Sequence, residues 1–365
     1  MNRRKVDGVF LGIVLALVLL GVFIFSSALL GLLARDEVRF SAIAFNQIFF
    51  GVIGGLIALT ITSKINYKIW RKYSFFILLT SIFLTLLVFI PGLGFEHGGA
   101  KRWISIGSFS LQPAEFLKLG IVIYLASWFS FMRTKVKNIR FGLLPLIGIL
   151  ALAAGLLLKQ PDTGTFLVIF LASLAVFITA GGKWKHILSL GGLSLLGLSI
   201  LAYFRPYIQD RIMTFLDPSR DPLGSAYQIQ QSLIAVGSGE FFGRGFGQSI
   251  QKFNFLPEPV GDSIFAVAAE EFGFVGALII ISLFVAFAIR GLKIAKHAPD
   301  AFSRLLVTGI VILIASQSFI NIASMLGIFP LTGLPLLFIS QGGTAMLISL
   351  AATGVILNVS KYCKF

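Results

Sequence analysis

The chain has little charge and almost no cysteine or histidine for its length. Only 12% of its 365 residues are charged, with 15 acidic residues against 30 basic ones. Its single cysteine, Cys363, excludes an internal disulfide and a cysteine-based metal site. The three histidines, His97, His186 and His297, lie far apart in the sequence and lack the spacing of metal ligands. A soluble globular domain would need more charge than this to cover its surface.

Apolar sequence takes the place of charge. Hydrophobic residues make up 57% of the chain, and its mean hydropathy is +0.94. Apolar runs of about 20 residues recur, and each can cross the ~30 Å hydrocarbon core of a bilayer as a helix. We predict an all-α polytopic membrane protein that forms one domain over residues 1–365. About ten spans are expected, at 8–34, 42–62, 74–92, 113–132, 141–159, 163–181, 187–204, 263–289, 303–327 and 337–358.

The loops between these spans alternate in charge. Loops on the side of the N-terminus hold 19 of the 30 basic residues but only two acidic ones, Asp7 and Asp300. Because positively charged loops stay in the cytoplasm, we predict that both termini are cytoplasmic. The net charge of +15 then reflects topology and not nucleic-acid binding. Two long loops, about 93–112 and 205–262, are expected outside, the larger one between the seventh and eighth spans.

The stretch 256–273 runs from a proline-broken loop into an apolar helix and carries several acidic residues. Asp262 lies at the junction, and Glu270 and Glu271 follow about two turns deeper. One charged side chain at the bilayer centre costs about 2.5–3.5 kcal/mol even on the mildest scale, so these acids indicate a site. The alternative for Asp262 is a simple N-cap of the eighth helix. Glu258 is interpreted as an exposed loop residue.

Further polar groups lie at the outer ends of other spans. Glu115 and Lys118 are three residues apart and share one helix face, as an ion pair or as a polar lining. Lys101 and Arg102 either hold a phosphate or anchor the chain at the membrane interface. Asp162, in a tight outer turn, can cap the helix that follows it.

The larger outer loop contains a glycine-rich stretch around Arg244, at 242–247. No strand–helix–strand pattern surrounds it, which excludes a dinucleotide-binding fingerprint. Gln228 and Gln231 share one face of a short amphipathic segment. After the ninth span, 327–344 is apolar but broken by proline and glycine. Such backbone at membrane depth must pack against protein or line a cavity.

A series of separated motifs runs along the chain. It comprises GAKRW at 99–103, QPAEFLK at 112–118, QPDTGT at 160–165, QSLIA at 231–235, FLPE at 255–258, Asp262 with IFAV at 264–267, NI at 321–322, GLP at 333–335 and SQGG at 340–343. In this order they resemble the SEDS family (shape, elongation, division and sporulation), which contains RodA and FtsW. Three short stretches look closer to FtsW than to RodA, namely Asp217 with Pro218, residues 227–228 and residues 338–343.

The resemblance implies a peptidoglycan glycosyltransferase that polymerises lipid II, an undecaprenyl-pyrophosphate disaccharide-pentapeptide, outside the bacterial cytoplasmic membrane. It also implies a class B penicillin-binding protein as transpeptidase partner, with other divisome or elongasome membrane proteins. By motif match, Asp262 is the catalytic aspartate, and Glu115 and Lys118 line the cavity. Three departures stand nearby. Val260 and Gly261 precede the aspartate where the family usually has His-Thr, and Ser263 follows it where the family usually has Phe. Glu240 stands where glycine is usual.

The residue types fit this chemistry independently. An acceptor sugar hydroxyl needs a carboxylate base, which we assign to Asp262, and the departing pyrophosphate needs facing cations. No cofactor is required, although Mg²⁺ held by Asp262 and the pyrophosphate would suit oxygen ligands. The predicted substrate-binding residues are Lys101, Arg102, Glu115, Lys118, Asp162, Arg244 and Glu270.

Two other functions remain open. A lipid II flippase needs a polar path across the whole bilayer, whereas the acids predicted here sit at the outer ends of helices. A non-catalytic division scaffold leaves Glu115, Lys118 and Asp262 without a role. Polymerisation of lipid II by the purified protein separates these alternatives.

Overall fold

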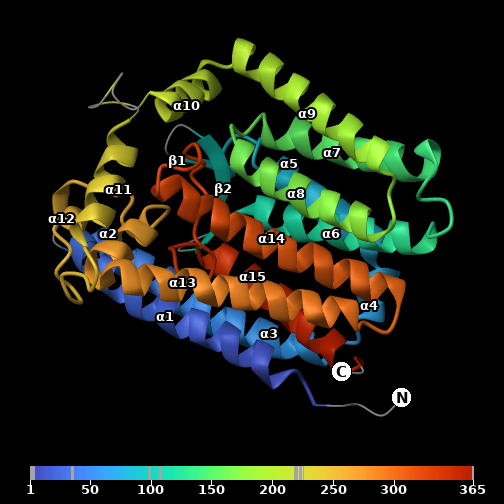
Figure 1. Ribbon diagram of the computed structural model, residues 1–365, viewed down its shortest axis with the longest axis horizontal. Helices are drawn as coiled ribbons and strands as arrows, with labels where there is room; N and C mark the ends of the chain where they lie inside the picture. The colour runs from blue at the N-terminus through green and yellow to red at the C-terminus, as the bar shows by residue number, and fades with distance from the viewer. Residues whose placement is uncertain are drawn as a thin grey trace.

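The computed structural model describes residues 5–33, 37–97, 100–106, 109–217, 221, 224 and 226–363. Among the motif residues, Gly98, Gly99 and Pro218 lie outside this set. The molecule consists mainly of helices aligned along its long axis (Figure 1).

Eight described segments are long and apolar enough to cross a membrane. They are α1 (Gly8–Leu33), Phe40–Lys64, α6 (Pro113–Phe131), Ile139–Leu157, α9 (Trp184–Phe204), α13 (Ile264–Lys296), α14 (Ala301–Met325) and α15 (Gly343–Ser360). Phe40–Lys64 combines most of α2 (Glu37–Phe45) with η1 (Asn46–Ile53) and α3 (Gly54–Lys64), and Ile139–Leu157 combines η2 (Ile139–Leu143) with α7 (Leu144–Leu157). Two shorter apolar helices are α5 (Ser74–Leu87) and α8 (Thr163–Thr179). These segments coincide in sequence with the predicted spans, which confirms the helical polytopic fold. The number that crosses the bilayer stays a prediction.

Two predicted boundaries differ from the structure by more than five residues. The eighth span, predicted at 263–289, continues as α13 to Lys296, because its last turns carry basic residues that suit the water side of the membrane. The last span, predicted to start at 337, begins only at Gly343. Residues 337–342 form turns instead, with Phe338 at a φ of 67°. Like the helix that follows it, this turn region has an apolar composition. Composition alone therefore does not show where the turns end and the helix begins.

The first outer loop contains a small sheet that the sequence reading did not predict. Three antiparallel strands, β1 (Gly94–His97), β2 (Ala100–Ile106) and β3 (Phe109–Leu111), pair in the order β1-β2-β3. Trp103 lies opposite Phe95, and Ile104 opposite Leu111. These short strands satisfy their backbone groups with one another where the chain leaves the helices.

The two ends of the molecule differ in what they contain. Figure 1 shows both termini at one end, together with α4 (Lys68–Lys72), whose sequence is basic. The sheet, α10 (Pro206–Leu216), α11 (Tyr227–Ser238) and α12 (Gln251–Asn254) lie at the other end. The predicted amphipathic segment at Gln228 and Gln231 lies within one of these helices, α11. We call the end with the sheet the outer end, following the predicted topology.

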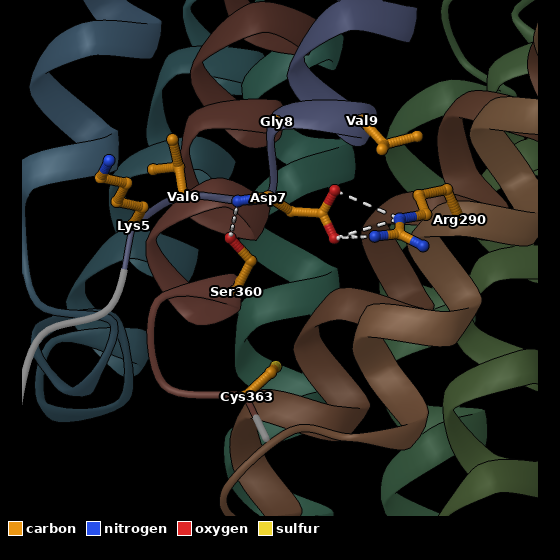
Figure 2. Close-up of a pocket in the computed structure, with 8 residues that line it drawn as sticks. All are labelled: Lys5, Val6, Asp7, Gly8, Val9, Arg290, Ser360 and Cys363. Atoms are coloured by element: carbon orange, nitrogen blue, oxygen red, sulfur yellow. Dashed lines mark hydrogen bonds and ion pairs between the residues drawn. The ribbon is translucent and has the colours of Figure 1, made fainter. Parts of the chain in front are cut away.

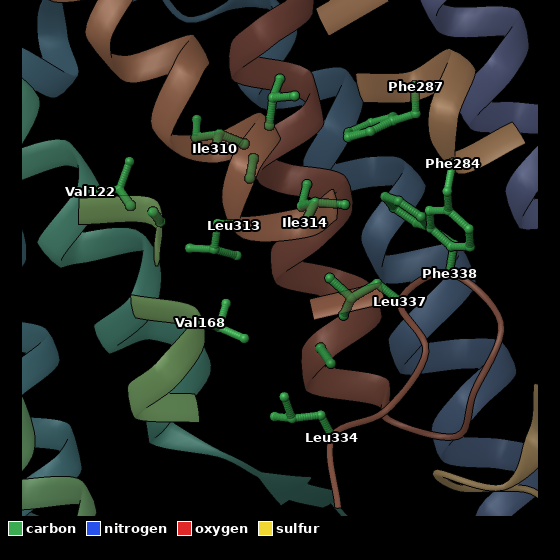
Figure 3. Close-up of a cluster of buried hydrophobic side chains, with 14 of the residues drawn as sticks. Val122, Val168, Phe284, Phe287, Ile310, Leu313, Ile314, Leu334, Leu337 and Phe338 are labelled. Atoms are coloured by element: carbon green, nitrogen blue, oxygen red, sulfur yellow. The ribbon is translucent and has the colours of Figure 1, made fainter. Parts of the chain in front are cut away.

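The core is built around α14. Figure 3 shows Ile310 and Ile314 of α14 between Val122 of α6 and the rings of Phe284 and Phe287 of α13. All of these side chains are fully buried. By contrast, only 6% of the residues in the most apolar part of α9 are buried, compared with 78% in the most apolar part of α14. Helix α9 therefore lies at the edge of the bundle. Of these core helices, α6 carries the predicted residues Glu115 and Lys118, and α13 carries Glu270 and begins just after Asp262.

Candidate active site

Asp262 lies at the start of α13, one residue before its N-cap. The N-cap is Ser263, which makes no side-chain capping bond, so the structure does not give Asp262 the capping role. The Asp262 carbonyl accepts a 2.7 Å hydrogen bond from the Asn321 side chain. Burial raises the pKa of the Asp262 carboxyl to about 6; the Glu258 carboxylate adds to the increase, and Arg211 opposes it. A carboxyl with this pKa can accept a proton near neutral pH, as a general base must.

Arg211 of α10 is the cation that faces Asp262. A Cβ atom placed on Gly333 would lie 3.9 Å from both Arg211 Nη2 and Asp262 Oδ2, so the two charged groups flank one glycine. The guanidinium lies 5.5 Å from the ring centroid of Tyr207 and donates a long hydrogen bond of 3.4 Å to the carbonyl of Thr332. The sequence analysis did not select Arg211. The available signal was its spacing, four residues after Tyr207 on one helix face.

Arg102 and Asp162 bring two other outer segments to this place. Arg102 of β2 donates to the backbone carbonyls of residues 160 and 161, with Nε at 3.1 Å from the first. Asp162 caps α8, accepting from the Thr165 N–H at 3.1 Å and from its hydroxyl at 2.9 Å. Burial lowers the pKa of Arg211, Arg102 lowers it further, and Asp162 raises it. The two predicted residues therefore lie within electrostatic reach of Arg211.

Glu115 and Lys118 form a buried pair in the first turns of α6. Lys118 Nζ donates to Glu115 Oε1 at 2.7 Å and to Gln317 Oε1 at 2.6 Å. The two charged side chains are only 3% and 1% exposed. Gln317 in turn donates to the carbonyl of Pro335 at 3.1 Å. This arrangement confirms that Glu115 and Lys118 share a helix face and form an ion pair.

Asn321 connects this pair to Asp262. It lies one turn beyond Gln317 on α14 and donates at 2.7 Å to the carbonyls of both Asp262 and Leu334. Two polar side chains on one helix therefore hold the segment 334–335 and the start of α13 together. Gln317 was not selected from the sequence. Its spacing of four residues from Asn321, inside an apolar span, was the signal.

Three predicted residues lie apart from Asp262. Lys101 is exposed, and because neighbouring strand residues point to opposite faces, it points away from Arg102. Arg244 lies 3.6 Å from Glu270 across an ion pair and is 40% exposed. Glu270 is about 12 Å along the chain from Asp262 at helical rise. The predicted substrate contacts of these three residues stay predictions.

The carboxylates near Asp262 limit how a metal ion could bind. Among the described residues no group of three His, Cys, Asp or Glu side chains could hold a metal. Asp262 and the exposed Glu258 are the carboxylates at this point. Two carboxylates are enough to hold Mg²⁺ only if substrate phosphates and waters supply the other ligands of the ion.

One cavity lies away from these groups. It measures about 400 Å³ and is lined by Lys5, Val6, Asp7, Gly8, Val9, Arg290, Ser360 and Cys363, at the end that holds the termini (Figure 2). Its carboxylate, Asp7, already pairs with Arg290 at 2.8 Å. A cavity of about 60 Å³ lies beside Arg211, lined also by Asp210, Thr214, Phe215, Ile229 and Leu331. The smaller cavity adjoins the candidate site.

Comparison with known proteins agrees with this arrangement. The chain is 41% identical over 319 residues to stage V sporulation protein E of Bacillus subtilis, covering 87% of each chain. It is 38% identical over 354 residues to the probable peptidoglycan glycosyltransferase FtsW of Trichlorobacter lovleyi, covering 97% and 93%.

Two solved structures share the fold. A chain from a study of how a peptidoglycan synthase complex coordinates polymerization and crosslinking superposes with a TM-score of 0.79, at 27% identity and 97% coverage of both chains. The rod-shape-determining protein RodA of Thermus thermophilus superposes with a TM-score of 0.68, at 25% identity, covering 97% and 96%. The cell-cycle-protein family profile of FtsW, RodA and SpoVE matches residues 8–364. The chain therefore belongs to the FtsW, RodA and SpoVE family, the SEDS family that its motifs resemble.

Proposed function

We propose that this protein is a peptidoglycan glycosyltransferase that polymerises lipid II into glycan strands at the outer face of the cytoplasmic membrane. Family membership supports the activity, because relatives that match over most of the chain are named peptidoglycan glycosyltransferase. The single observation that carries the proposal is the carboxyl of Asp262. It stands at the outer end of the bundle, has a raised pKa, makes no capping bond and faces a half-buried arginine.

The reaction joins an acceptor sugar hydroxyl to an anomeric carbon that carries the undecaprenyl pyrophosphate. Asp262 takes the hydroxyl proton as the new C–O bond forms, and the bond from the anomeric carbon to the pyrophosphate oxygen breaks. Arg211 and Arg102 face the charge that develops on the leaving group. Lys118 lies in the adjoining cluster, where Glu115 and Gln317 fix its ammonium.

Mg²⁺ belongs to the proposal as an ion that Asp262 would hold when the substrate is bound. When bound, it would supply charge stabilisation to the leaving phosphates. Chelation tests this point: activity that is lost with EDTA and returns with Mg²⁺ supports the ion, and full activity in EDTA contradicts it.

The partner and the orientation follow from the same reading. We propose a class B penicillin-binding protein as partner, together with other divisome or elongasome membrane proteins. One structural relative comes from a peptidoglycan synthase complex. The basic loops support cytoplasmic termini. The glycan strands serve septal or lateral wall synthesis, and the residues at 227–228 and 338–343 look closer to FtsW.

The test is polymerisation of purified lipid II by the purified protein, with Asp262→Asn as the matched variant. Asparagine keeps the shape of the side chain but cannot accept the proton. Loss of a general base typically costs a factor of about 10²–10⁴, so the variant should purify at normal yield and make almost no polymer.

Two outcomes would contradict the proposal. Near-normal polymer from Asp262→Asn would remove the catalytic assignment. Absence of polymer from the wild-type protein, with transfer of lipid II between leaflets of a vesicle, would favour the flippase alternative.

A further inference from the structure

Glu270 and Glu271 lie inside α13, where the proposed reaction does not use them. Glu270 accepts hydrogen bonds from the Ser249 hydroxyl at 2.5 Å and from the N–H groups of Ile250 and Gln251 at 3.0 and 3.3 Å. Its side chain is 1% exposed. Glu270 therefore ties the segment that begins α12 to the side of α13.

Glu271 connects the same segment to a second helix. Its Oε1 accepts from Lys252 Nζ at 2.6 Å and from the Ser27 hydroxyl of α1 at 2.6 Å. Lys252 Nζ also donates to Ser27 Oγ at 2.9 Å. Lys252 and Ser27 are fully buried, and Glu271 is 1% exposed. We call Ser27, Ser249, Lys252, Glu270 and Glu271 the clamp.

The clamp lies against a break in α13. At Gly273 the backbone takes φ 65° and ψ −162°, a conformation that favours glycine. The N–H groups of residues 244 and 245 donate to the carbonyls of 270 and 271 at 3.0 and 2.9 Å, and those of 274 and 275 donate to the carbonyls of 240 and 241 at 2.9 and 3.2 Å. A Cβ on Gly273 would lie 2.4 Å from the Gly243 nitrogen, so the loop backbone fills the break directly.

The break separates a short outer half-helix, residues 264–272, from the rest of α13. A nine-residue helix has little stability of its own. Asp262 lies two residues before this half-helix, so any tilt of the half-helix moves the carboxyl relative to Arg211 on α10 and Asn321 on α14.

We propose that Glu270, Glu271 and Lys252 are positioning residues that hold loop 240–255 in the break and thereby fix the half-helix that carries Asp262. This inference rests on the proposed function. Its physical basis is that the clamp joins the loop, the half-helix and α1 through buried polar contacts, beside the ring contacts of Phe23 with Phe246 and Phe272. A misplacement of about 1 Å at a reacting group can lower the rate about 10²-fold, so the clamp should act on turnover more than on substrate binding.

The experiment compares two double variants that both remove the buried charges. Glu271→Gln with Lys252→Met keeps an oxygen that can accept from Ser27 and from the Ser249 N–H. Glu271→Leu with Lys252→Met removes that oxygen. Because neither leaves a lone buried charge, both should melt close to the wild type. We expect the Gln variant to keep kcat within about threefold and the Leu variant to lose about 10²-fold in kcat, with KM for lipid II little changed.

The chain supplies a matched control at its other end. There the buried Asp7 forms an ion pair with the partly exposed Arg290, next to Ser360 (Figure 2). Asp7→Asn with Arg290→Met should alter stability about as much as the clamp variants and leave kcat unchanged. If this control lowers kcat as much as the Leu variant does at equal loss of Tm, the clamp effect is general stability and the proposal is wrong.

Two further readouts keep the tests of clamp and reaction apart. Hydrogen–deuterium exchange should rise over 240–255 and 264–272 in the Leu variant but not in the Asp7 control, and this does not depend on activity. If the Leu variant does not fold, Ser27→Ala, which removes only the α1 contact, should give the same exchange pattern with a smaller loss of kcat. Wild-type kcat in the clamp variants, with Asp262→Asn inactive, would overturn the positioning role and leave the proposed function intact.

Discussion

At the scale of single residues, the chemistry depends on Asp262 and on the groups that set its charge. Burial and Glu258 raise the pKa of the Asp262 carboxyl to about 6, while Gln228 and Arg211 oppose the increase. A base must be deprotonated to work. The environment therefore places the change from the protonated carboxyl to the working carboxylate just below neutral pH, where a small change at a neighbour alters the active fraction.

This pKa predicts the pH dependence of polymerisation. We expect kcat/KM for lipid II to rise with pH through about 6 and to level off above it, since the deprotonated form is the base. Glu258→Gln removes one cause of the raised pKa and should move the rising limb to lower pH. Rates measured between about pH 5 and pH 8 check both points. An unchanged limb in Glu258→Gln would contradict the assignment of this limb to Asp262.

The folding stability should change with pH in the opposite direction to the activity. The folded-state pKa lies above the ordinary value of 3.8, so the charged form destabilises the fold progressively as pH rises from 3.8 to about 6. Asp262→Asn removes this cost. At pH 7 we expect its Tm to equal or exceed that of the wild type, measured by thermal unfolding in detergent. A clear decrease would mean that the carboxylate holds the fold together.

The Glu115–Lys118 pair gives a second prediction for individual side chains. Lys118→Met leaves Glu115 as a lone buried charge and should cost about 3–5 kcal/mol of folding stability. Adding Glu115→Gln should restore most of this stability. If the pair also contacts substrate, the stable double variant still makes no polymer. A fully active double variant would limit the pair to a structural role.

At the scale of elements, the break in α13 explains why glycine suits a position where this chain departs from the family pattern. Glu240 stands where the family usually has glycine, and its φ is 47°. Its carbonyl accepts a hydrogen bond from the N–H of Phe274, beyond the break in α13. This bond to α13 holds the strained residue in place. The position favours glycine for a backbone reason and not for a side-chain contact.

Glu240→Gly should therefore stabilise the protein. A left-handed conformation costs an L-residue about 1–2 kcal/mol, and the extra freedom of glycine in the unfolded chain returns part of this gain. We expect a net gain of about 0.5–1 kcal/mol, seen as a higher Tm, with polymerisation unchanged. Gly273→Ala is the opposite control, because its Cβ would meet backbone at 2.4 Å and should destabilise the fold.

At the scale of the whole molecule, the candidate site lies at one end. The sheet, α10, α11 and α12 gather there, away from the termini (Figure 1). This end also holds Asp262, Arg211 and the Glu115–Lys118 pair. An enzyme that acts on a substrate at the outer membrane surface needs its polar groups on that side only.

The topology is testable by cysteine labelling. Gln209 is exposed on α10 and Lys137 is exposed in the loop before η2, while the natural Cys363 is buried. Gln209→Cys should react with an impermeant thiol reagent in intact spheroplasts, and Lys137→Cys only after lysis. The reverse pattern would invert the topology and exclude an extracytoplasmic substrate.

Much of this protein follows from its sequence alone. Apolar runs long enough to span a bilayer require helices, since backbone groups in lipid must pair within their own segment. Glu115 and Lys118 share a face because helical spacing brings residues three apart together. Asp262 is selected by its place at the junction of a polar loop and an apolar helix, and by the motifs around it.

Other features depend on contacts between distant segments. Arg211 faces Asp262 only because α10 folds back over the loop at Gly333, and Gln317 and Asn321 matter only because α14 passes between α6 and the start of α13. Glu270 and Glu271 resemble site acids in the sequence, yet the fold gives them partners on α1 and α12. Local spacing specifies which side chains share a helix face. Which faces then meet depends on the packing of helices far apart in the chain.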